Sequence, residues 1–369
     1  MTATHTRSQS LSIPFHIEPS STPLPTSERR KILADPGFGR HFTDHMVVID
    51  WEEDTEWHDA RVTPLRPFSM HPGCVALHYA QGVFEGLKAY RRPDTSVWLF
   101  RPLLNSRRFR DSAARLALPE LDDDLFLASL ISLVQVDQEW IPRNNRESSL
   151  YLRPFMFGTE EALGVRPSRT VTYAVIASPA APYFPGGSTG MRLWVGKYPR
   201  AWQGGTGSAK YGGNYSANLL AEREASTQGC DHVLFLDEAG CVQESGNMNL
   251  FAVTSRDELI TPSLGTILEG VTRASILSLA EDHDLTPIER RLPFDELASG
   301  CLSGYIQEVF AVGTAAVVNP IVGFKGPNCD FTVSGGVPGP RSAALRNHLL
   351  DIQYGVRPDP FGWMVEVPL

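Results

Sequence analysis

The chain has 369 residues, of which 42% are apolar and 20% charged, and its formal net charge is −9. That length suits two domains, and the composition excludes a globally disordered chain. The negative charge argues against nucleic acid as the main partner, because phosphate binding requires concentrated Lys and Arg. No apolar run approaches the roughly 18 residues that a membrane-spanning helix needs, so no membrane partner is expected.

The cysteines and the first residues indicate the compartment. The five cysteines are widely spaced, odd in number and without a C-x-x-C pair, which is typical of free thiols in a reducing environment. The opening MTATHTRSQSLSIPF has no apolar stretch long enough for a signal peptide. We therefore expect a cytoplasmic protein.

The first half of the chain predicts a tail and then a small domain. Residues 1–35 are rich in Ser, Thr and Pro and are expected to lie on the surface or stay partly mobile. Apolar periodicity over 36–178, the small domain, predicts several elements. They are strands at 45–51, 97–102, 149–158 and 171–178, and helices at 104–118 and 124–136.

A segment rich in Pro and Gly, residues 179–190, cannot continue a helix or a central strand and predicts an interdomain linker. Residues 191–369 follow as the large domain. Its expected elements are strands at 191–198, 231–237, 241–246 and 249–254, helices at 214–228 and 271–283, and a buried strand with a turn at 309–318. Short hairpins mixed with helices predict an α/β (α+β-like) fold.

The most informative stretch is the glycine-rich segment 204–215, GGTGSAKYGGNY. It fails as a P-loop, because Ala209 precedes Lys210 and Tyr211 follows it, and it fails as a dinucleotide fingerprint because Lys210 stands at the third glycine. A lysine in such a loop is most often solvated. The glycines nevertheless let the backbone approach a flat ligand, with the Tyr215 phenol five residues on. In that setting Lys210 is a candidate nucleophile for an aldehyde cofactor.

Three downstream residues suit other parts of such a cofactor. Glu244 lies near the end of the predicted hairpin strand 241–246, just before a glycine, where a carboxylate can hold the protonated nitrogen of a pyridine ring. An exposed hairpin glutamate is the alternative. The helix start at 268–273, with Thr272, suits a phosphate, although an ordinary helix start has the same pattern. Thr314 follows an apolar strand and either offers donors to an anion or lies in a core turn.

A metal site is not expected. His71, Cys74 and His78 have spacings of three and four, which would place them together only on a helix. Pro72 and Gly73 interrupt that helix, and no further ligand cluster lies nearby in the sequence.

Together these segments resemble the branched-chain aminotransferases, which are fold-type-IV enzymes that use pyridoxal phosphate. The resemblance extends from about residue 36 to residue 364 and rests on many motifs in the right order. They are PGFGRHFTDHMVVIDW, HPGCVALHYAQGVFEGLKAYRR, LYLRPFMFG, GGTGSAKYGGNY, the Glu244 segment, EGVTR, VFAVGTAA and the closing GWM. The resemblance implies two domains with the cofactor between them.

The family pattern also implies roles for residues that bind pyridoxal 5'-phosphate. Lys210 matches the lysine that forms the Schiff base and moves the substrate α-proton. Tyr215 matches the phenol that bonds the ring hydroxyl, and Glu244 matches the partner of the pyridine nitrogen. The phosphate-binding positions correspond to Arg108, Val271, Thr272 and Thr314.

The implied partners are small molecules, namely amino acids and 2-oxo acids. Thr314 and Ala315, with Tyr79, match the grip on the substrate α-carboxylate, and Arg153 matches the arginine that meets the distal carboxylate of glutamate or supports Tyr79. The apolar pocket walls correspond to Phe38, Phe84, Tyr151 and Tyr183. Leu163 and Val165 match a loop that reaches the partner subunit's site, which implies a homodimer.

The resemblance leaves several points open. Asn247 stands where the family usually has a small residue, so its amide is expected to narrow or polarise the pocket. The C-x-x-C of some animal members is absent, since Ala316 and Asn319 occupy the matching places.

The expected reaction moves the amino group between a branched-chain or related apolar L-amino acid and 2-oxoglutarate. The alternatives are a D-amino-acid aminotransferase, an aminodeoxychorismate lyase, an aminotransferase of a specialised pathway, and a ligand-binding relative without activity.

Overall fold

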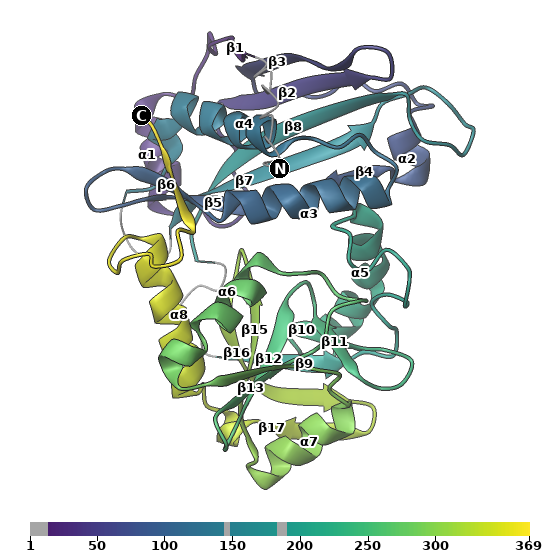
Figure 1. The fold of residues 1–369 in the computed structure, drawn as a ribbon, viewed down its shortest axis with the longest axis vertical. Coiled ribbons are helices and arrows are strands. Elements are labelled where there is room, and N and C mark those ends of the chain that lie inside the picture. Colours follow the sequence, from purple (N-terminus) through teal and green to yellow (C-terminus); the bar gives the residue numbers. More distant parts are fainter. Residues whose placement is uncertain (1–13, 144–147, 183–189) are drawn as a thin grey trace, which may run out of the picture.

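The structure is a computed structural model that describes residues 14–143, 148–182 and 190–369. The described chain forms two mixed β-sheets with helices around them, one sheet in the upper half of Figure 1 and one in the lower half. The predicted α/β (α+β-like) class is confirmed. No helix within the described ranges is long and apolar enough to cross a membrane.

The first sheet has the strand order β1-β3-β2-β8-β7-β5-β6-β18, with β4 paired to β7. Its strands are β1 (His16–Ile17), β2 (His45–Glu52), β3 (Glu56–Pro64), β4 (Gly82–Phe84), β5 (Leu87–Arg91), β6 (Val97–Phe100), β7 (Ser149–Gly158), β8 (Thr170–Ala180) and β18 (Met364–Val367). The helices of this half are α1 (Thr26–Ala34), α2 (Val75–Tyr79), α3 (Pro102–Arg115) and α4 (Asp123–Val136).

Alternation along β7 separates a core face from a site face. Leu150, Leu152 and Met156 are buried in a core that includes residues of α3 and α4. Because successive side chains of a strand point to opposite faces, Tyr151 and Arg153 lie together on the other face, where both are half-buried. The period-2 pattern of this strand therefore positions two of the expected substrate residues.

The second sheet has the order β11-β10-β9-β16-β15-β12-β13-β14, with β17 paired to β16. Its strands are β9 (Met191–Val195), β10 (His232–Leu236), β11 (Val242–Ser245), β12 (Asn249–Thr254), β13 (Glu258–Thr261), β14 (Thr286–Glu289), β15 (Ile306–Gly313), β16 (Val317–Gly326) and β17 (Cys329–Thr332). The helices are α5 (Gly212–Thr227), α6 (Val271–Leu279), α7 (Phe294–Ser303) and α8 (Pro340–Gln353). Figure 1 shows α5 and α8 on opposite sides of the molecule.

Most predicted elements are present, with shifted ends that have local causes. The strand expected at 97–102 ends at Phe100, because Pro102 occupies the first turn of α3. Helix α5 ends at Thr227, and Gly229 follows with φ +74°. Strand β8 continues through Pro179 and Ala180, two residues into the expected linker, where they pair with Leu150 and Ser149.

Several elements were not predicted from the sequence: α1, α2, α7 and α8, and strands β1, β3, β4, β5, β13, β14, β17 and β18. Two of them, α1 and β18, lie near the ends of the chain. Residues of the expected tail form α1, which has no buried residue and so lacks the apolar stripe that marks a helix in sequence. The last strand, β18, returns to the first sheet and pairs with β6 from Met364–Phe100 to Val367–Val97. The C-terminus therefore joins the sheet of the N-terminal half.

Candidate active site

Lys210 lies at the end of the glycine-rich loop, just before α5, and its backbone is tied to the first half of the molecule. Its N–H donates to Ser112 Oγ on α3 at 2.9 Å, and its carbonyl accepts from the Phe84 N–H at 3.1 Å. Tyr211 and Val83 form an isolated antiparallel bridge beside it. These contacts place the lysine between the two sheets.

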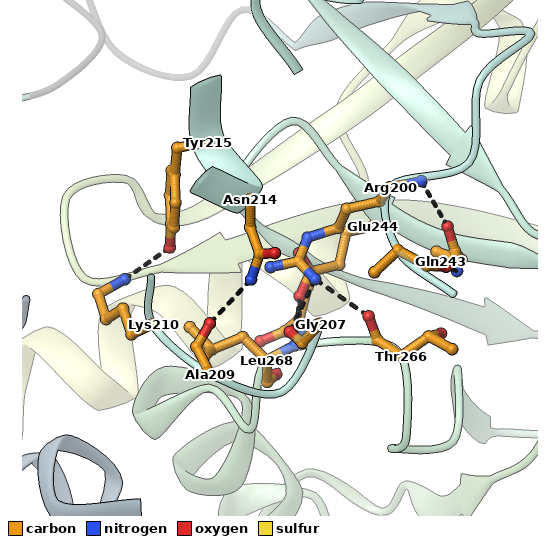
Figure 2. Close-up of polar contacts among 12 residues, drawn as sticks. Arg200, Gly207, Ala209, Lys210, Asn214, Tyr215, Gln243, Glu244, Thr266 and Leu268 are labelled. Carbon is orange, nitrogen blue, oxygen red and sulfur yellow. Dashed lines mark hydrogen bonds and ion pairs between the residues drawn. The ribbon is translucent and has the colours of Figure 1, made fainter. Parts of the chain in front are cut away.

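The Lys210 side chain meets a phenol and an aromatic wall. Its Nζ donates to Tyr215 Oη at 2.8 Å, as Figure 2 shows, and lies 4.9 Å from the ring centroid of Phe84. The rings of Phe84 and Tyr215 pack edge to face with centroids 4.9 Å apart. The structure thus brings together the predicted amine, its phenol and one wall of the pocket.

Glu244 is a buried carboxylate on β11, only 2% exposed, so the alternative of an exposed hairpin glutamate is wrong. Its Oε1 accepts from the Leu268 N–H and from Asn249 Nδ2, each at 3.0 Å. Its Oε2 lies 2.5 Å from Arg200 Nε. Burial raises the pKa of Glu244, and the Arg200 guanidinium is the strongest influence opposing that rise.

Arg108, the predicted phosphate arginine, is held by a glutamate that sequence reasoning missed. Its Nε and Nη2 donate to the two carboxylate oxygens of Glu85 at 2.6 and 2.9 Å, and its Nη1 donates to Glu269 O at 2.8 Å. Glu85 is fully buried and also accepts from Asn105 Nδ2 at 2.7 Å. Despite the cost of burial, Arg108 lowers the pKa of Glu85 below its usual value.

The start of α6 fits the phosphate that the sequence predicts. The helix begins at Val271, and its N-cap, Gly270, provides no side-chain cap, so the first amides remain available for an anion. A Cβ on Gly270 would lie 2.0 Å from Asn249 Oδ1, which explains the glycine. Thr272 is buried in the first turn. The described residues therefore fit a phosphorylated cofactor.

The predicted carboxylate grip, Thr314 and Ala315, forms the turn between β15 and β16. Lys88 Nζ donates to Ala315 O at 3.1 Å and ties this turn to the first sheet. Val317, directly after the turn, has φ +60°, a conformation that is strained for a β-branched residue and is often found at functional sites. Asn319 Nδ2 donates to Ala316 O at 2.9 Å and so stabilises the end of this turn.

The expected pocket walls form one cluster. Phe38 packs edge to face on Tyr151 with centroids 5.2 Å apart, and Arg153 Nη2 donates to Tyr151 Oη at 3.1 Å. The Arg153 guanidinium lies 4.9 Å from the Phe84 ring centroid, and its Nε is buried without a hydrogen-bond partner in the described chain. A Cβ on Gly86 would lie 1.8 Å from Tyr151 Oη, so only glycine fits there. Tyr183 lies outside the described residues.

Tyr79, Leu163 and Val165 lie together on the surface. The Tyr79 hydroxyl donates to Leu163 O at 2.5 Å, and the three residues are 38%, 69% and 84% exposed. This contact joins Tyr79 to the loop rather than to the Thr314–Ala315 turn, with which the sequence pattern had grouped it.

No group of three or more His, Cys, Asp or Glu in the described ranges is arranged to hold a metal ion. Cys74 Sγ donates to Gly158 O at 3.2 Å, and His78 Nε2 lies 2.8 Å from Pro72 O. The residues considered for a metal site thus have structural contacts.

Sequence reasoning missed three buried residues that contact the expected site residues: Glu85, Arg200 and Asn249. Glu85 lies within a quoted motif, FEGLKAY, and Asn249 lies five residues after Glu244. Their importance comes from burial next to another charged or polar group, and residue type alone predicts exposure for all three. For Glu85, the sequence did contain one indication of burial: a charged residue next to apolar positions within a family motif.

Asn247 lies exposed at the tip of the hairpin between β11 and β12, close to the turn formed by Thr314 and Ala315. A Cβ on Gly313 would lie 4.0 Å from Asn247 O. The hairpin is closed by two backbone bonds between Ser245 and Met248, both 2.9 Å.

We expect Asn247→Gly to raise kcat/KM for the bulkiest branched substrates relative to small ones by about tenfold, since one methylene of fit has an effect of roughly 1–3 kcal/mol. Steady-state kinetics with L-Val, L-Leu, L-Ile and L-Phe measure the change. An unaltered ranking of the four substrates, with some loss of stability, would assign Asn247 to turn chemistry instead.

Comparisons with known proteins agree with this geometry. The model of the family described as amino-transferase class IV matches residues 82–324. A probable branched-chain-amino-acid aminotransferase of Streptomyces coelicolor is 50% identical over 95% of this chain and 98% of its own length. The branched-chain-amino-acid aminotransferase of Mycolicibacterium smegmatis is 46% identical over 96% of this chain and 98% of its own length.

Solved structures give the same result. A branched-chain amino acid aminotransferase from T.th., solved with pyridoxamine 5'-phosphate, has a TM-score of 0.73 and 29% identity, covering 87% of this chain and 98% of its own. The Escherichia coli enzyme of the same name has a TM-score of 0.73 and 26% identity, covering 87% and 99%. The predicted fold type and family resemblance are confirmed. The chain therefore belongs to the amino-transferase class IV family, and over nearly its whole length it is related to branched-chain-amino-acid aminotransferases.

Proposed function

We propose that this enzyme transfers the amino group between a branched-chain or related apolar L-amino acid and 2-oxoglutarate, with pyridoxal 5'-phosphate as its cofactor. The observation that carries the proposal is the convergence of the Lys210 amine, the Tyr215 phenol and the buried Glu244 carboxylate on one site between the sheets (Figure 2). The names of the relatives and the pyridoxamine 5'-phosphate in the solved T.th. enzyme support it.

The side chains around Lys210 divide the chemistry between them. Bound pyridoxal phosphate supplies an aldehyde carbon for amine exchange and a ring that accepts electrons from the substrate. Lys210 would hold the cofactor through its amine and would take the proton from the substrate α-carbon. Tyr215 Oη, 2.8 Å from Nζ, holds that amine in place. The Glu244 carboxylate would face the ring nitrogen and favour its protonated form.

The phosphate is assigned to the start of α6. The amides of Val271 and Thr272 have the uncapped geometry that an anion needs, and the positive end of the helix dipole favours negative charge there. Thr314 lies on the neighbouring turn and adds a hydroxyl. Arg108 is fixed beside Glu269 O, one residue before the N-cap, which sets its guanidinium near the same point.

One pocket must accept both an apolar side chain and the distal carboxylate of glutamate. The rings of Phe38, Phe84 and Tyr151 supply apolar walls. Arg153 lies among them with a buried, unpaired Nε–H, and a planar guanidinium suits the carboxylate of 2-oxoglutarate. When the substrate side chain is apolar, the Arg153 guanidinium remains stacked on the aromatic rings of the pocket.

A substrate panel tests the proposal against its alternatives. With 2-oxoglutarate as acceptor we expect activity on L-Leu, L-Ile and L-Val, less on L-Phe and none on D-Ala. A preference for D-Ala identifies a D-amino-acid aminotransferase, and pyruvate release from aminodeoxychorismate identifies a lyase. Activity on an apolar L-amino acid other than the branched-chain three indicates a specialised pathway, and no turnover at all indicates a ligand-binding relative. The relatives' names favour none of these alternatives.

We further propose a homodimer formed through the α2 patch, which consists of Leu77, Tyr79, Leu163 and Val165. These apolar residues are 38–84% exposed, and contiguous exposed apolar surface of this kind marks an interaction site. The loop that carries Leu163 and Val165 is fixed to α2 by the bonds Val75 N–H to Glu160 O and Ala162 N–H to Gly73 O, both 3.0 Å. The patch is therefore a preformed surface.

We expect wild type to sediment as a dimer and Val165→Asp as a monomer with reduced activity, because a charge buried in an apolar interface is strongly disfavoured. Leu302→Asp, at a leucine on α7 that is 71% exposed, is the matched control and should remain a dimer. A dimer that tolerates Val165→Asp excludes this patch from the interface.

A further inference from the structure

Arg200 is a buried arginine for which the sequence suggests no function. Its side chain is 2% exposed, and its Nε lies 2.5 Å from Glu244 Oε2. Its Nη1 donates to Gly207 O at 2.9 Å and to Thr266 O at 3.0 Å, as Figure 2 shows. The guanidinium thus joins the carboxylate to two backbone carbonyls.

The first consequence concerns the charge of Glu244. A carboxyl group with 2% exposure strongly favours the neutral form unless charged or donating groups oppose it. The opposing groups are the guanidinium of Arg200, the Leu268 N–H and the more distant charges of Lys210 and Arg108, in that order. The Asn249 amide also donates to Oε1. Among these, Arg200 is the cation in contact with the carboxylate.

The second consequence concerns the loops around the site. Gly207 belongs to the loop that leads to Lys210, and Thr266 belongs to the segment that leads to α6. The two loops approach so closely that a Cβ on Gly207 would lie 2.2 Å from Thr266 O. The same guanidinium bonds both carbonyls. Removal of Arg200 should therefore loosen both the loop that leads to Lys210 and the segment that leads to α6.

Arg200 is itself held by the residue next to Glu244. Gln243 Oε1 accepts from the Arg200 N–H and its Nε2 donates to Ala201 O, both at 2.8 Å. Because consecutive residues of a strand point to opposite faces, Gln243 can hold the backbone of the 200–201 segment while Glu244 meets its side chain. The pairing of Arg200 with Glu244 is thus preset by β11.

From these contacts we propose that Arg200 is a positioning residue that keeps the Glu244 carboxylate ionised and fixed for the ring nitrogen of the cofactor. The proposal rests on the proposed function, because the ring nitrogen belongs to pyridoxal phosphate. It assigns Arg200 no direct contact with the reacting atoms. Its effect passes through the charge of Glu244.

The test is the pH dependence of pyridoxal phosphate binding to the apoprotein, measured by absorbance and protein fluorescence for wild type, Arg200→Met and Arg200→Lys. For Arg200→Met the binding midpoint assigned to Glu244 should move upward by roughly 1–3 pH units, the shift that loss of a neighbouring charge produces. Affinity should therefore fall at neutral pH and recover in alkali. Arg200→Lys should lie between Arg200→Met and wild type, since it restores the charge without the fork of donors.

Two controls separate charge from structure. Arg61→Met removes an arginine that is also ion-paired, to Asp50 at 2.9 Å on the first sheet, and should bind as wild type does. In a Glu244→Gln background, Arg200→Met should leave the pH profile unchanged, because the titrating group is gone.

A uniform loss of affinity at every pH, or an unshifted midpoint, would overturn the proposal and leave Arg200 as a structural clamp. If Arg200→Met does not fold, Arg200→Gln, which also lacks the charge, takes its place, and a wild-type midpoint in that variant overturns the proposal. A wild-type protein that binds no pyridoxal phosphate would instead refute the proposed function.

Discussion

The purified protein is expected to be yellow, and borohydride should fix pyridoxal phosphate irreversibly on Lys210. The reason is that Lys210 Nζ is held by Tyr215 Oη at 2.8 Å between the sheets. An amine positioned in this way can bond the aldehyde carbon of the cofactor. Peptide mapping after reduction measures the result, since a label on the peptide that contains Lys210 distinguishes it from the other lysines. Those are Lys31, Lys88, Lys197 and Lys325.

Lys210→Ala should abolish the reducible link and lower turnover by at least about 10⁴-fold, because one side chain serves as both nucleophile and general base. Lys197→Ala is a suitable control, since Lys197 is exposed and paired with Glu224 at 3.1 Å. A label on any other lysine, or a colourless protein that binds no pyridoxal phosphate, would refute the assignment.

Glu244→Gln should leave the cofactor bound and slow α-proton removal by on the order of 10²-fold or more, because a neutral amide no longer keeps the ring nitrogen protonated. Single-turnover absorbance kinetics measure the step directly. An unchanged rate would show that the ring nitrogen has another partner.

The same variant should be less stable, because it leaves the buried Arg200 without a counter-charge. Breaking a buried pair in this way typically costs about 3–5 kcal/mol. Glu289→Gln is the matched control: Glu289 pairs with the buried Arg273 at 2.6 Å but is itself 48% exposed, so water can replace it. Urea unfolding of the apoproteins compares the two variants.

Stability should also change with pH in a direction set by Glu244. Since burial raises its pKa, the folded protein binds more protons than the unfolded chain between the unfolded and folded values. The stability of wild type therefore falls as the pH rises through that window, and Glu244→Gln should lack this component. An identical pH dependence of unfolding in both proteins would contradict the shift.

Local patterns predicted much of the fold because they depend on near neighbours in the sequence. The alternation of β7, which puts Tyr151 and Arg153 on one face, follows from the two-residue period of a strand. The end of α5 before Gly229 follows from the conformational freedom of glycine. Helix α1 was missed because it buries no residue and so has no apolar stripe to detect.

The sequence by itself determined the types of those elements that local patterns predicted, the aminotransferase motifs and the candidate roles of Lys210, Tyr215 and Glu244. Only the tertiary structure decided which charges meet inside the protein. Arg200 and Glu244 are 44 positions apart and Arg108 and Glu85 are 23 apart, yet both pairs are buried and in contact. Residue type alone predicts that each of these Arg and Glu side chains is exposed. Their burial depends on chain segments that approach one another only when the sheets and loops have packed. Local periodicity cannot predict such long-range contacts.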